Sequence, residues 1–363
     1  MYIVLFFIIL AILVLVHEFG HFYAAKKSGV RVDEFGLGFP PRMFGKMWKG
    51  TFYSMNWIPF GGFVKIFGEN PNDESISGPE SGKSFVNRPK WVQILILSGG
   101  VIMNILFAWI LFSIAYMSGM TMGVSESTSK YITNPHVIVL DVLPESPAQK
   151  AGLLAGDEVI SYSFAGATTS ATTVEGLQET IKNSKGKTVG VEVQRMADVK
   201  YIALVPEQGV LGDRFAVGIS MDLVGKADLP FFAAFWEGAK LTWNMGINIV
   251  TSIYGLIHDA VLGQADISQI SGPVGIARLV GDAGKLGFVY LLSFTAFISL
   301  NLAVLNLVPF PALDGGRILF VLIEAVIRRP IKPKVANTVN AIGFGLLLAF
   351  MLFITYKDIA KLV

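Results

Sequence analysis

The chain has 363 residues, of which 53% are hydrophobic and only 15% are charged. Soluble domains carry about a quarter charged residues, so this composition argues against a soluble protein and indicates several membrane-spanning segments. The net charge of +2 gives no sign of a nucleic-acid partner. The chain has no cysteine, which excludes disulfides and thiolate metal sites, so any metal must bind through histidine and carboxylate groups.

The first apolar run, about residues 3–25, is long enough to cross a bilayer. It lacks a basic n-region and a small-residue cleavage pattern, and two lysines follow it, so we expect a retained anchor. The run contains His17-Glu18-Phe19-Gly20-His21. On a helix, His17 and His21 share one face and can bind one metal ion, while Glu18 can act on a water beside it. The alternative is a pair of packed histidines, but ionisable groups at membrane depth usually serve a function.

The connection after this run predicts a β-element at about residues 31–66. Strand patterns at 51–58 and 63–66 flank a turn that contains Gly61 and Gly62. An exposed strand edge can pair with an extended peptide through main-chain hydrogen bonds. We therefore expect Gly61 and Gly62 to lie where a substrate is held.

Three more apolar runs complete four predicted transmembrane helices, at about 92–118, 286–308 and 336–356. Basic residues outnumber acidic ones by ten to six in the 26–90 connection and by five to one in the 317–334 connection. Both connections should therefore be cytoplasmic, and the two chain termini and residues 124–226 should lie outside.

A weaker apolar segment, about 231–257, is interrupted by Glu237 and Lys240. If this segment crossed the bilayer, the basic 317–334 connection would face outside. We therefore expect residues 227–285 to form an amphipathic segment on the outer membrane surface, anchored by aromatic side chains. The alternative is a true fifth span whose polar side chains contact the helix bundle.

Residues 124–226 have the alternation and the turns of a water-exposed α+β domain. A helix is predicted at about 173–183, with strands near 188–194 and 200–205. The pattern resembles a bacterial PDZ domain, whose groove can accept a peptide by strand addition. Alternatively, the groove stays empty and the domain only obstructs access, excluding substrates that still carry bulky outer domains.

A carboxylate near the third span is the candidate third ligand. A catalytic zinc usually takes three protein ligands and leaves one position open. The predicted topology brings Asp314 to the depth of His17 and His21. Two prolines break the helix before Asp314, and two glycines after it allow a close backbone approach. The alternative is that Asp314 caps an ordinary helix.

The two separated motifs together point to a known family. His17-Glu18-Phe19-Gly20-His21, followed downstream by Asn306, two prolines and Leu313-Asp314-Gly315, resembles the site-2 protease family of intramembrane metalloproteases. With its PDZ-like insert, the chain is similar to the bacterial regulator of sigma-E protease group, whose better-known members carry two such domains. The resemblance covers nearly the whole chain. It implies zinc bound by His17, His21 and Asp314, Glu18 as general base, and Asn306 as a residue that holds substrate near the metal.

The resemblance also bears on two glycine-rich stretches. It implies a membrane-associated β-element that includes Gly36-Leu37-Gly38-Phe39, so Gly36 and Gly38 are further expected substrate-binding residues. The alternative for this tetrapeptide is a connecting turn without substrate contact. Residues 98–104 in the second span resemble the family's small-residue pattern, in which we expect Asn104 to serve helix packing.

The sequence thus predicts a polytopic α-helical membrane protein with about four transmembrane helices, a cytoplasmic-side membrane-associated β-element and an inserted extracytoplasmic PDZ-like α+β domain. Its expected parts are a first membrane part at 1–123, the PDZ-like domain at 124–226, the surface segment at 227–285 and a second membrane part at 286–363.

The predicted function is zinc-dependent cleavage of single-span membrane proteins in the bacterial inner membrane, with the active site toward the cytoplasm. Pre-clipped anti-sigma factors or signal-peptide remnants are the expected substrates, and the lipid bilayer is the other partner. Two alternatives are a non-catalytic PDZ-bearing adaptor with a structural zinc and a metal or ion transporter. Glu18 argues against the adaptor, because a structural site needs no base, and the single His-Glu-His cluster argues against the transporter.

Overall fold

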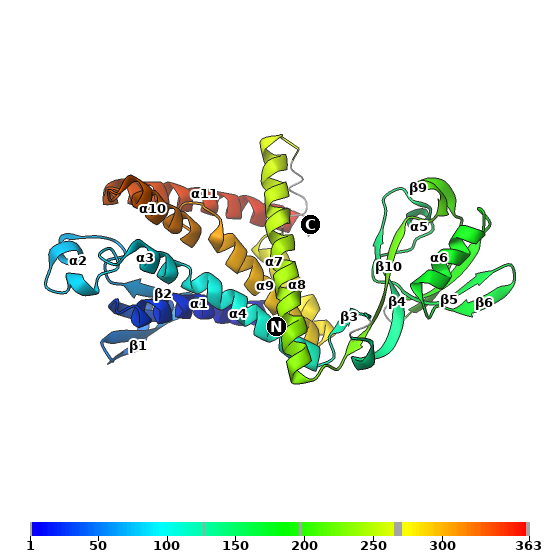
Figure 1. Cartoon of the computed structure of the whole chain (residues 1–363), viewed down its shortest axis with the longest axis horizontal. Helices are drawn as coiled ribbons and strands as arrows, with labels where there is room; N and C mark the ends of the chain where they lie inside the picture. Colours follow the sequence, from blue (N-terminus) through cyan, green and yellow to red (C-terminus); the bar gives the residue numbers. More distant parts are fainter. Residues whose placement is uncertain (1, 126–127, 196–197, 265–270, 361–363) are drawn as a thin grey trace. The chain divides into compact units, whose positions relative to one another are not determined.

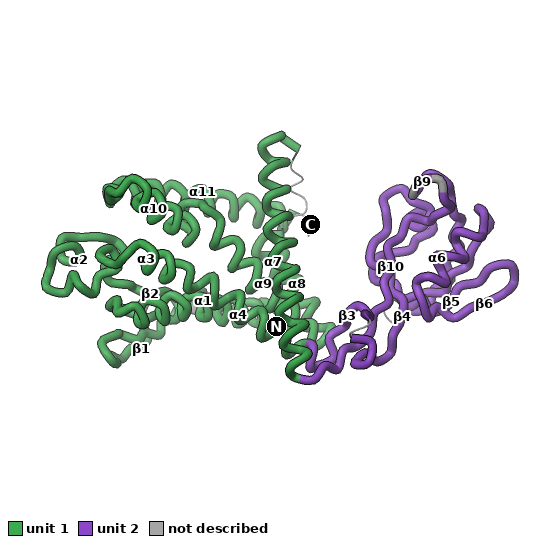
Figure 2. Tube along the Cα trace, viewed as in Figure 1, with its two compact units in different colours: residues 1–115, 231–363 green, residues 116–230 purple. Residues whose placement is uncertain are grey.

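The computed structural model describes residues 2–125, 128–195, 198–264 and 271–360. The chain forms two compact units, which Figure 2 distinguishes by colour. Unit 1 consists of residues 1–115 and 231–363, and unit 2 consists of residues 116–230. Unit 2 is therefore an insertion between two chain segments that together build unit 1.

Among the described residues, four helices of unit 1 are long and apolar enough to cross a membrane, as the sequence predicts. They are α1 (Tyr2–Lys27), α4 (Gly99–Met117), α9 (Phe288–Leu307) and α11 (Pro333–Ala360). The second predicted span begins later than expected, because a separate helix, α3 (Lys90–Leu97), precedes it and ends at Ser98. These four helices are consistent with a multi-pass membrane protein.

The expected surface segment contains two helices, α7 (Phe231–Val261) and α8 (Pro273–Leu286), while residues 265–270 of it lie outside the described part. In Figure 1, α7 runs across the direction of α1 and α11. Small residues such as Ala234 and Gly238 line the buried face of α7, and Trp109 of α4 donates a hydrogen bond to the Phe235 carbonyl at 2.7 Å. Large apolar side chains on its other faces, such as Trp243, are exposed.

The predicted basic connection at 317–334 is not a plain loop. Helix α10 (Asp314–Ile327) occupies much of it and packs against α3 and α9. Lys90 at the start of α3 forms an ion pair with Glu324 of α10 at 2.5 Å. The apolar residues of this connection therefore form a helical face that packs, while the expected cytoplasmic side of its basic residues stays a prediction.

The predicted β-element is a long antiparallel hairpin of β1 (Val32–Trp48) and β2 (Thr51–Ile66), which packs against α1. Both strands bend, so the first half of β1 pairs with both halves of β2. The resulting order across the sheet is 62–66, 32–37, 51–56 and 42–48. Among the described strands, segment 62–66 therefore pairs on one side only.

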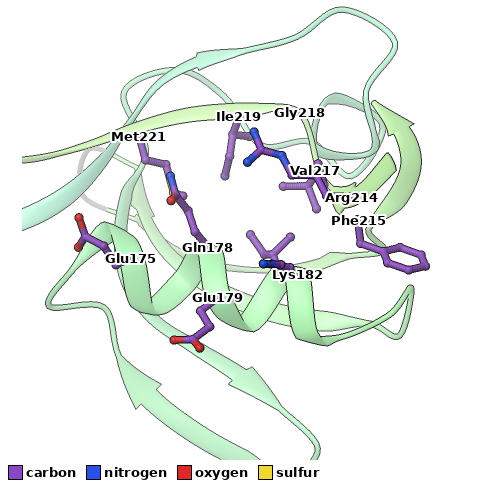
Figure 3. Close-up of a pocket in the computed structure, with 12 residues that line it drawn as sticks. Glu175, Gln178, Glu179, Lys182, Arg214, Phe215, Val217, Gly218, Ile219 and Met221 are labelled. Atoms are coloured by element: carbon purple, nitrogen blue, oxygen red, sulfur yellow. The ribbon is translucent and has the colours of Figure 1, made fainter. Parts of the chain in front are cut away.

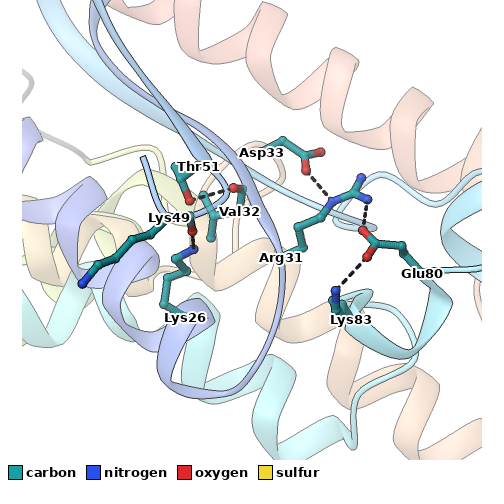
Figure 4. Close-up of polar contacts among 8 residues, drawn as sticks. All are labelled: Lys26, Arg31, Val32, Asp33, Lys49, Thr51, Glu80 and Lys83. Atoms are coloured by element: carbon teal, nitrogen blue, oxygen red, sulfur yellow. Dashed lines mark hydrogen bonds and ion pairs between the residues drawn. The ribbon is translucent and has the colours of Figure 1, made fainter. Parts of the chain in front are cut away.

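Polar contacts tie this hairpin to the neighbouring chain (Figure 4). Lys26 at the end of α1 donates to the Lys49 carbonyl in the hairpin turn at 3.2 Å. Arg31 pairs with Asp33 at 2.7 Å and with Glu80 at 2.5 Å. Glu80 belongs to the connection that contains α2 (Asp73–Ser77) and the short 3-10 helix η1 (Ser81–Lys83), so these contacts hold the connection against the hairpin.

Unit 2 is built on a seven-stranded antiparallel sheet with the order β3-β10-β4-β5-β7-β8, and β6 pairs with β5. Its core is formed by alternating apolar residues of the central strands with Leu177 and Ile181 of helix α6. The elements in chain order are β3 (Thr121–Gly123), η2 (Ser129–Tyr131), β4 (Ile132–Val142), α5 (Pro147–Lys150), β5 (Glu158–Phe164), β6 (Ala167–Ser170), α6 (Val174–Asn183), β7 (Val189–Arg195), β8 (Asp198–Leu204), β9 (Glu207–Ala216) and β10 (Ile219–Ala227).

The two ends of unit 2 lie next to each other. The Ala227 N–H donates to the Met120 carbonyl at 2.9 Å, and the Leu229 N–H donates to the Tyr116 carbonyl at 3.4 Å. Chain can therefore be inserted or removed between residues 120 and 227 with a short link.

Asp157 is a fully buried carboxylate in unit 2. Arg195 donates to both of its oxygens at 2.7 Å, and the Leu154 N–H donates at 2.9 Å. Burial opposes the charge, but the hydrogen bonds from Arg195 and Leu154 outweigh it and hold the pKa of Asp157 below its usual range. A carboxylate with a lowered folded-state pKa stabilises the fold above its unfolded pKa of about 3.9, and this stability is lost as pH falls through the folded-state pKa.

We expect residues 118–230, expressed alone, to lose stability as pH falls below about 4. Asp157→Asn should cost about 3 kcal/mol at neutral pH, because it leaves Arg195 without its charged partner, and should flatten this part of the pH profile. Urea unfolding followed by circular dichroism measures both effects. The exposed Asp198→Asn is the control and should change neither, while an unaltered profile in Asp157→Asn would contradict the assignment.

Candidate metal centre

Three ligand-type side chains from distant parts of the chain meet at one point. His17 and His21 lie one turn apart on α1, with their Nε2 atoms 3.2 Å from each other. Asp314 is the first residue of α10, and its Oδ2 lies 3.0 Å from His17 Nε2 and 3.3 Å from His21 Nε2. Among the described residues, these three form the group of histidine and acidic side chains close enough to hold a metal ion.

The turn between α9 and α10 places Asp314. Helix α9 ends at Leu307, and a Cβ atom at Gly315 would lie 2.3 Å from the Leu307 carbonyl oxygen. Only glycine therefore lets α10 begin against the end of α9. Asn340 of α11 accepts a hydrogen bond from the Ala312 N–H at 3.2 Å and holds the turn from the other side.

The geometry fits a zinc ion. Two ligand atoms at a tetrahedral angle, with bonds of roughly 2.0 Å, lie roughly 3.3 Å apart. The three distances between the ligand atoms agree with that separation. Asp314 Oδ2 is buried and makes no well-formed hydrogen bond within the described residues, as expected of an oxygen directed at a metal. Two imidazoles and one carboxylate are a donor set that suits zinc.

Glycines bring a second helix against this cluster. Cβ atoms at Gly20 and Gly99 would each lie 2.5 Å or less from the other residue's carbonyl oxygen, so the backbones of the two segments touch. A Cβ atom at Gly100 would lie 2.5 Å from His17 Cε1 and 2.6 Å from His21 Nε2. From the sequence we expected these small residues only to permit helix packing. The structure shows that Gly100 leaves the space that the two rings occupy.

We expect Gly100→Ala to lower zinc affinity by at least about tenfold, as when groups that orient metal ligands are lost. The added methyl group must displace one or both rings, because it would lie 2.5 Å from His17 Cε1 and 2.6 Å from His21 Nε2. Zinc content after dialysis against a chelator measures the effect. The control is Gly345→Ala on α11, where a Cβ atom has open space. Equal zinc retention by both variants would contradict this role of Gly100.

Glu18 lies beside the cluster in a polar cavity of about 520 Å³ that His17, His21 and Asp314 also line. Val64 of β2 lines the same cavity as Glu18. Arg317 of α10 also lines the cavity and forms an ion pair with Glu69. Further polar residues of the wall are Asp33, Lys65, Asn70, Asn72 and Ser75.

The predicted substrate-binding residues lie outside the cluster of metal ligands. Gly36 and Gly38 lie in β1, and Gly61 and Gly62 lie in β2. A Cβ atom at Gly62 would lie 3.7 Å from Glu18 Cγ, so this segment of backbone borders the cluster. Asn306 is half-buried on the last turn of α9 and is not among the described residues that line the cavity.

Two histidines and an aspartate grouped closely enough to hold one metal ion, with a glutamate beside them, are the residues of a zinc metallopeptidase site. The chain belongs to Peptidase family M50, the site-2 protease family, whose model matches residues 5–350. This confirms the family expected from the sequence. The family is zinc-dependent, which also confirms the predicted cofactor.

Relatives are similar over nearly their whole length. A Clostridium perfringens protein named "Putative zinc metalloprotease" is 36% identical over 99% of this chain and 98% of its own. A Clostridium acetobutylicum protein of the same description is 33% identical over 96% of this chain and 94% of its own. A Nostoc protein with the same description is 31% identical over 98% of this chain and 94% of its own.

Proposed function

We propose that the protein is an intramembrane zinc endopeptidase in which His17, His21 and Asp314 hold the metal and Glu18 is the general base. The observation that carries this proposal is the meeting of three ligand atoms within 3.3 Å of one another beside Glu18, where His17, Glu18 and His21 belong to a helix apolar enough to span a membrane. When bound, zinc polarises the scissile carbonyl and acidifies water.

Glu18 carries out the proton transfer. Its carboxylate takes a proton from the attacking water and returns it to the nitrogen of the leaving amine. The backbone of β2 at Gly62 borders this side chain. The polar wall of the cavity, with Lys65, Asn70 and Arg317, supplies water to a reaction that the lipid interior would otherwise keep dry.

The hairpin edge beside Glu18 suits an extended substrate. A transmembrane helix hides its peptide bonds in its own hydrogen bonds, so the enzyme must hold it open. Segment 62–66 pairs with 32–37 on one side only, and Gly62 borders Glu18. A peptide that adds to this edge would bring its main chain to the base. We assign Gly36, Gly38, Gly61 and Gly62 to this binding element, and we assign Asn306 to holding the substrate at the end of α9.

The substrates we propose are single-span membrane proteins, including anti-sigma factors already clipped outside and signal-peptide remnants. The excess of basic residues in the 26–90 and 317–334 connections supports a cytoplasmic active site in a bacterial inner membrane, with unit 2 outside. The direction of α7 across α1 and α11, with its exposed aromatic side chains, supports a position along the outer membrane surface.

Unit 2 would act as a PDZ-like domain. A pocket of about 430 Å³ lies between α6 and the chain around the end of β9 and the start of β10 (Figure 3). Gln178 and Lys182 come from α6, and Arg214 comes from β9. The position of this pocket beside a helix and a strand supports a peptide-binding groove. We propose that the unit also excludes substrates with bulky outer domains.

Replacing residues 121–226 by a short Gly-Ser link should permit cleavage of an unshortened substrate. The hydrogen bond between Ala227 and Met120 shows that the link need not span a gap. Immunoblots of the full-length and pre-trimmed substrate with each enzyme measure the change. The comparison variant is Arg214→Glu, which alters the groove but keeps the bulk of unit 2, so the requirement for trimming should persist. If the shortened enzyme still needs a trimmed substrate, the size filter is wrong.

The proposed activity is tested by incubating the purified protein with a single-span substrate in lipid vesicles. Mass spectrometry of the fragments should place the cut within or near the transmembrane segment. A zinc chelator should stop the reaction, and added zinc should restore it. Cleavage that survives complete removal of the metal would overturn the proposal, and zinc binding without cleavage of any single-span substrate would favour the adaptor.

A further inference from the structure

Asn104 of α4 is a completely buried amide next to the metal centre. Its Nδ2 lies 3.4 Å from Nδ1 of His17, and its Oδ1 has no hydrogen-bond partner among the described residues. The Asn104 backbone carbonyl separately accepts a hydrogen bond from Ser299 of α9 at 2.9 Å. Helix packing at this position therefore has its own contact, which does not involve the amide side chain.

The chemistry of the histidine determines how this amide must point. His17 and His21 direct Nε2 toward Asp314, so these nitrogens are the metal-binding ones. An imidazole that binds a metal through Nε2 carries its hydrogen on Nδ1 and needs an acceptor there. His21 has one, because its Nδ1 lies 2.9 Å from the Ile96 carbonyl oxygen.

His17 lacks such an acceptor while the amide presents its NH₂ group, because two donors then face each other. The oxygen and nitrogen of an amide occupy nearly the same space, and their assignment follows from the hydrogen bonds they make. Turning the Asn104 amide by half a rotation places Oδ1 against the His17 Nδ1–H. The same turn gives the buried Oδ1 a hydrogen-bond partner and gives His17 Nδ1–H its acceptor.

We propose that Asn104 is a positioning residue of the metal centre, whose Oδ1 accepts the hydrogen bond from His17 Nδ1–H. This contact fixes the ring orientation of His17 and the tautomer that leaves Nε2 free for zinc. The inference rests on the ligand set of the proposed function. It assigns to Asn104 a part in metal binding, where the sequence had suggested helix packing alone.

The test is zinc affinity of the full-length protein in detergent, measured by competition with a chromogenic chelator and without any substrate. Asn104→Leu removes the acceptor at similar size and should weaken zinc binding by about 10-fold to 100-fold. Asn104→Asp keeps an acceptor oxygen and should bind zinc at least as well as the unmodified protein. Ser113→Ala changes another buried polar residue of α4 and should leave zinc affinity unchanged.

Melting of the zinc-free variants separates this role from folding. Asn104→Leu should lose zinc affinity out of proportion to any change in its zinc-free melting temperature. If that variant does not fold, Asn104→Ala takes its place and should show the same loss. Unchanged zinc affinity in the folded variant, or an equal loss in Asn104→Asp, would overturn the proposal. Failure of the unmodified protein to bind zinc would instead refute the ligand set.

Discussion

Replacing Glu18 by glutamine should lower the rate of peptide cleavage by about 10²-fold to 10⁴-fold, the usual contribution of a general acid-base group. Glutamine has nearly the same shape, so it keeps the contact with β2, but it cannot take up a proton at neutral pH. Zinc should stay bound, because Glu18 is not among the three clustered ligand atoms. Cleavage of a single-span substrate in vesicles and the zinc content of the same preparation are the two measurements.

The matched change is Glu237→Gln on α7, where the carboxylate pairs with Lys240 on the same helix. This variant should cleave at the normal rate. Retained cleavage in Glu18→Gln would refute the proposed mechanism. Loss of zinc together with cleavage would show instead that Glu18 helps to hold the metal.

Replacing Asp314 by asparagine should abolish both zinc binding and cleavage. The change leaves two imidazoles and removes the one negative charge of the ligand set. Zinc that binds only the folded protein stabilises it by about 2.7 kcal/mol at a concentration 100 times its Kd. The unmodified protein should therefore melt at a higher temperature when zinc is added, and Asp314→Asn should show no such increase.

Asp282→Asn is the control, because Asp282 is a half-exposed carboxylate on α8 that pairs with Lys285. It should keep the full response to zinc. A normal zinc response in Asp314→Asn would exclude Asp314 as a ligand and would remove the structural basis of the proposed peptidase.

The features that a local pattern determines were predicted well. The two histidines sit one helical turn apart, and long apolar runs marked all four spans. Asp314 was found by an argument about depth in the membrane, which is a global constraint. The approach of Gly100 to the histidine rings and the contact of Asn340 with the turn before Asp314 were missed. Both depend on how separate helices pack, and no spacing within one segment encodes that.

The helix at 314–327 and the position of Asn104 also depend on contacts between segments that are distant in the sequence. The basic residues of the 317–334 connection drew attention to charge, although its apolar residues form a helix that packs on α3. Asn104 resembled an ordinary packing residue because its sequence neighbours are small. Asn104 is 87 residues away from His17 in the sequence, so no local pattern predicts their contact.

The insertion of unit 2 between the two halves of unit 1 has a consequence for biosynthesis. The ribosome completes His21 about 290 residues before Asp314, and at roughly 5–20 residues per second this delay lasts about 15–60 seconds. Throughout that interval, the nascent chain holds two imidazoles and a glutamate but lacks the aspartate. A chain whose translation stops before Asp314 therefore cannot assemble the complete ligand set. Such an incomplete chain cannot cleave neighbouring proteins through this site.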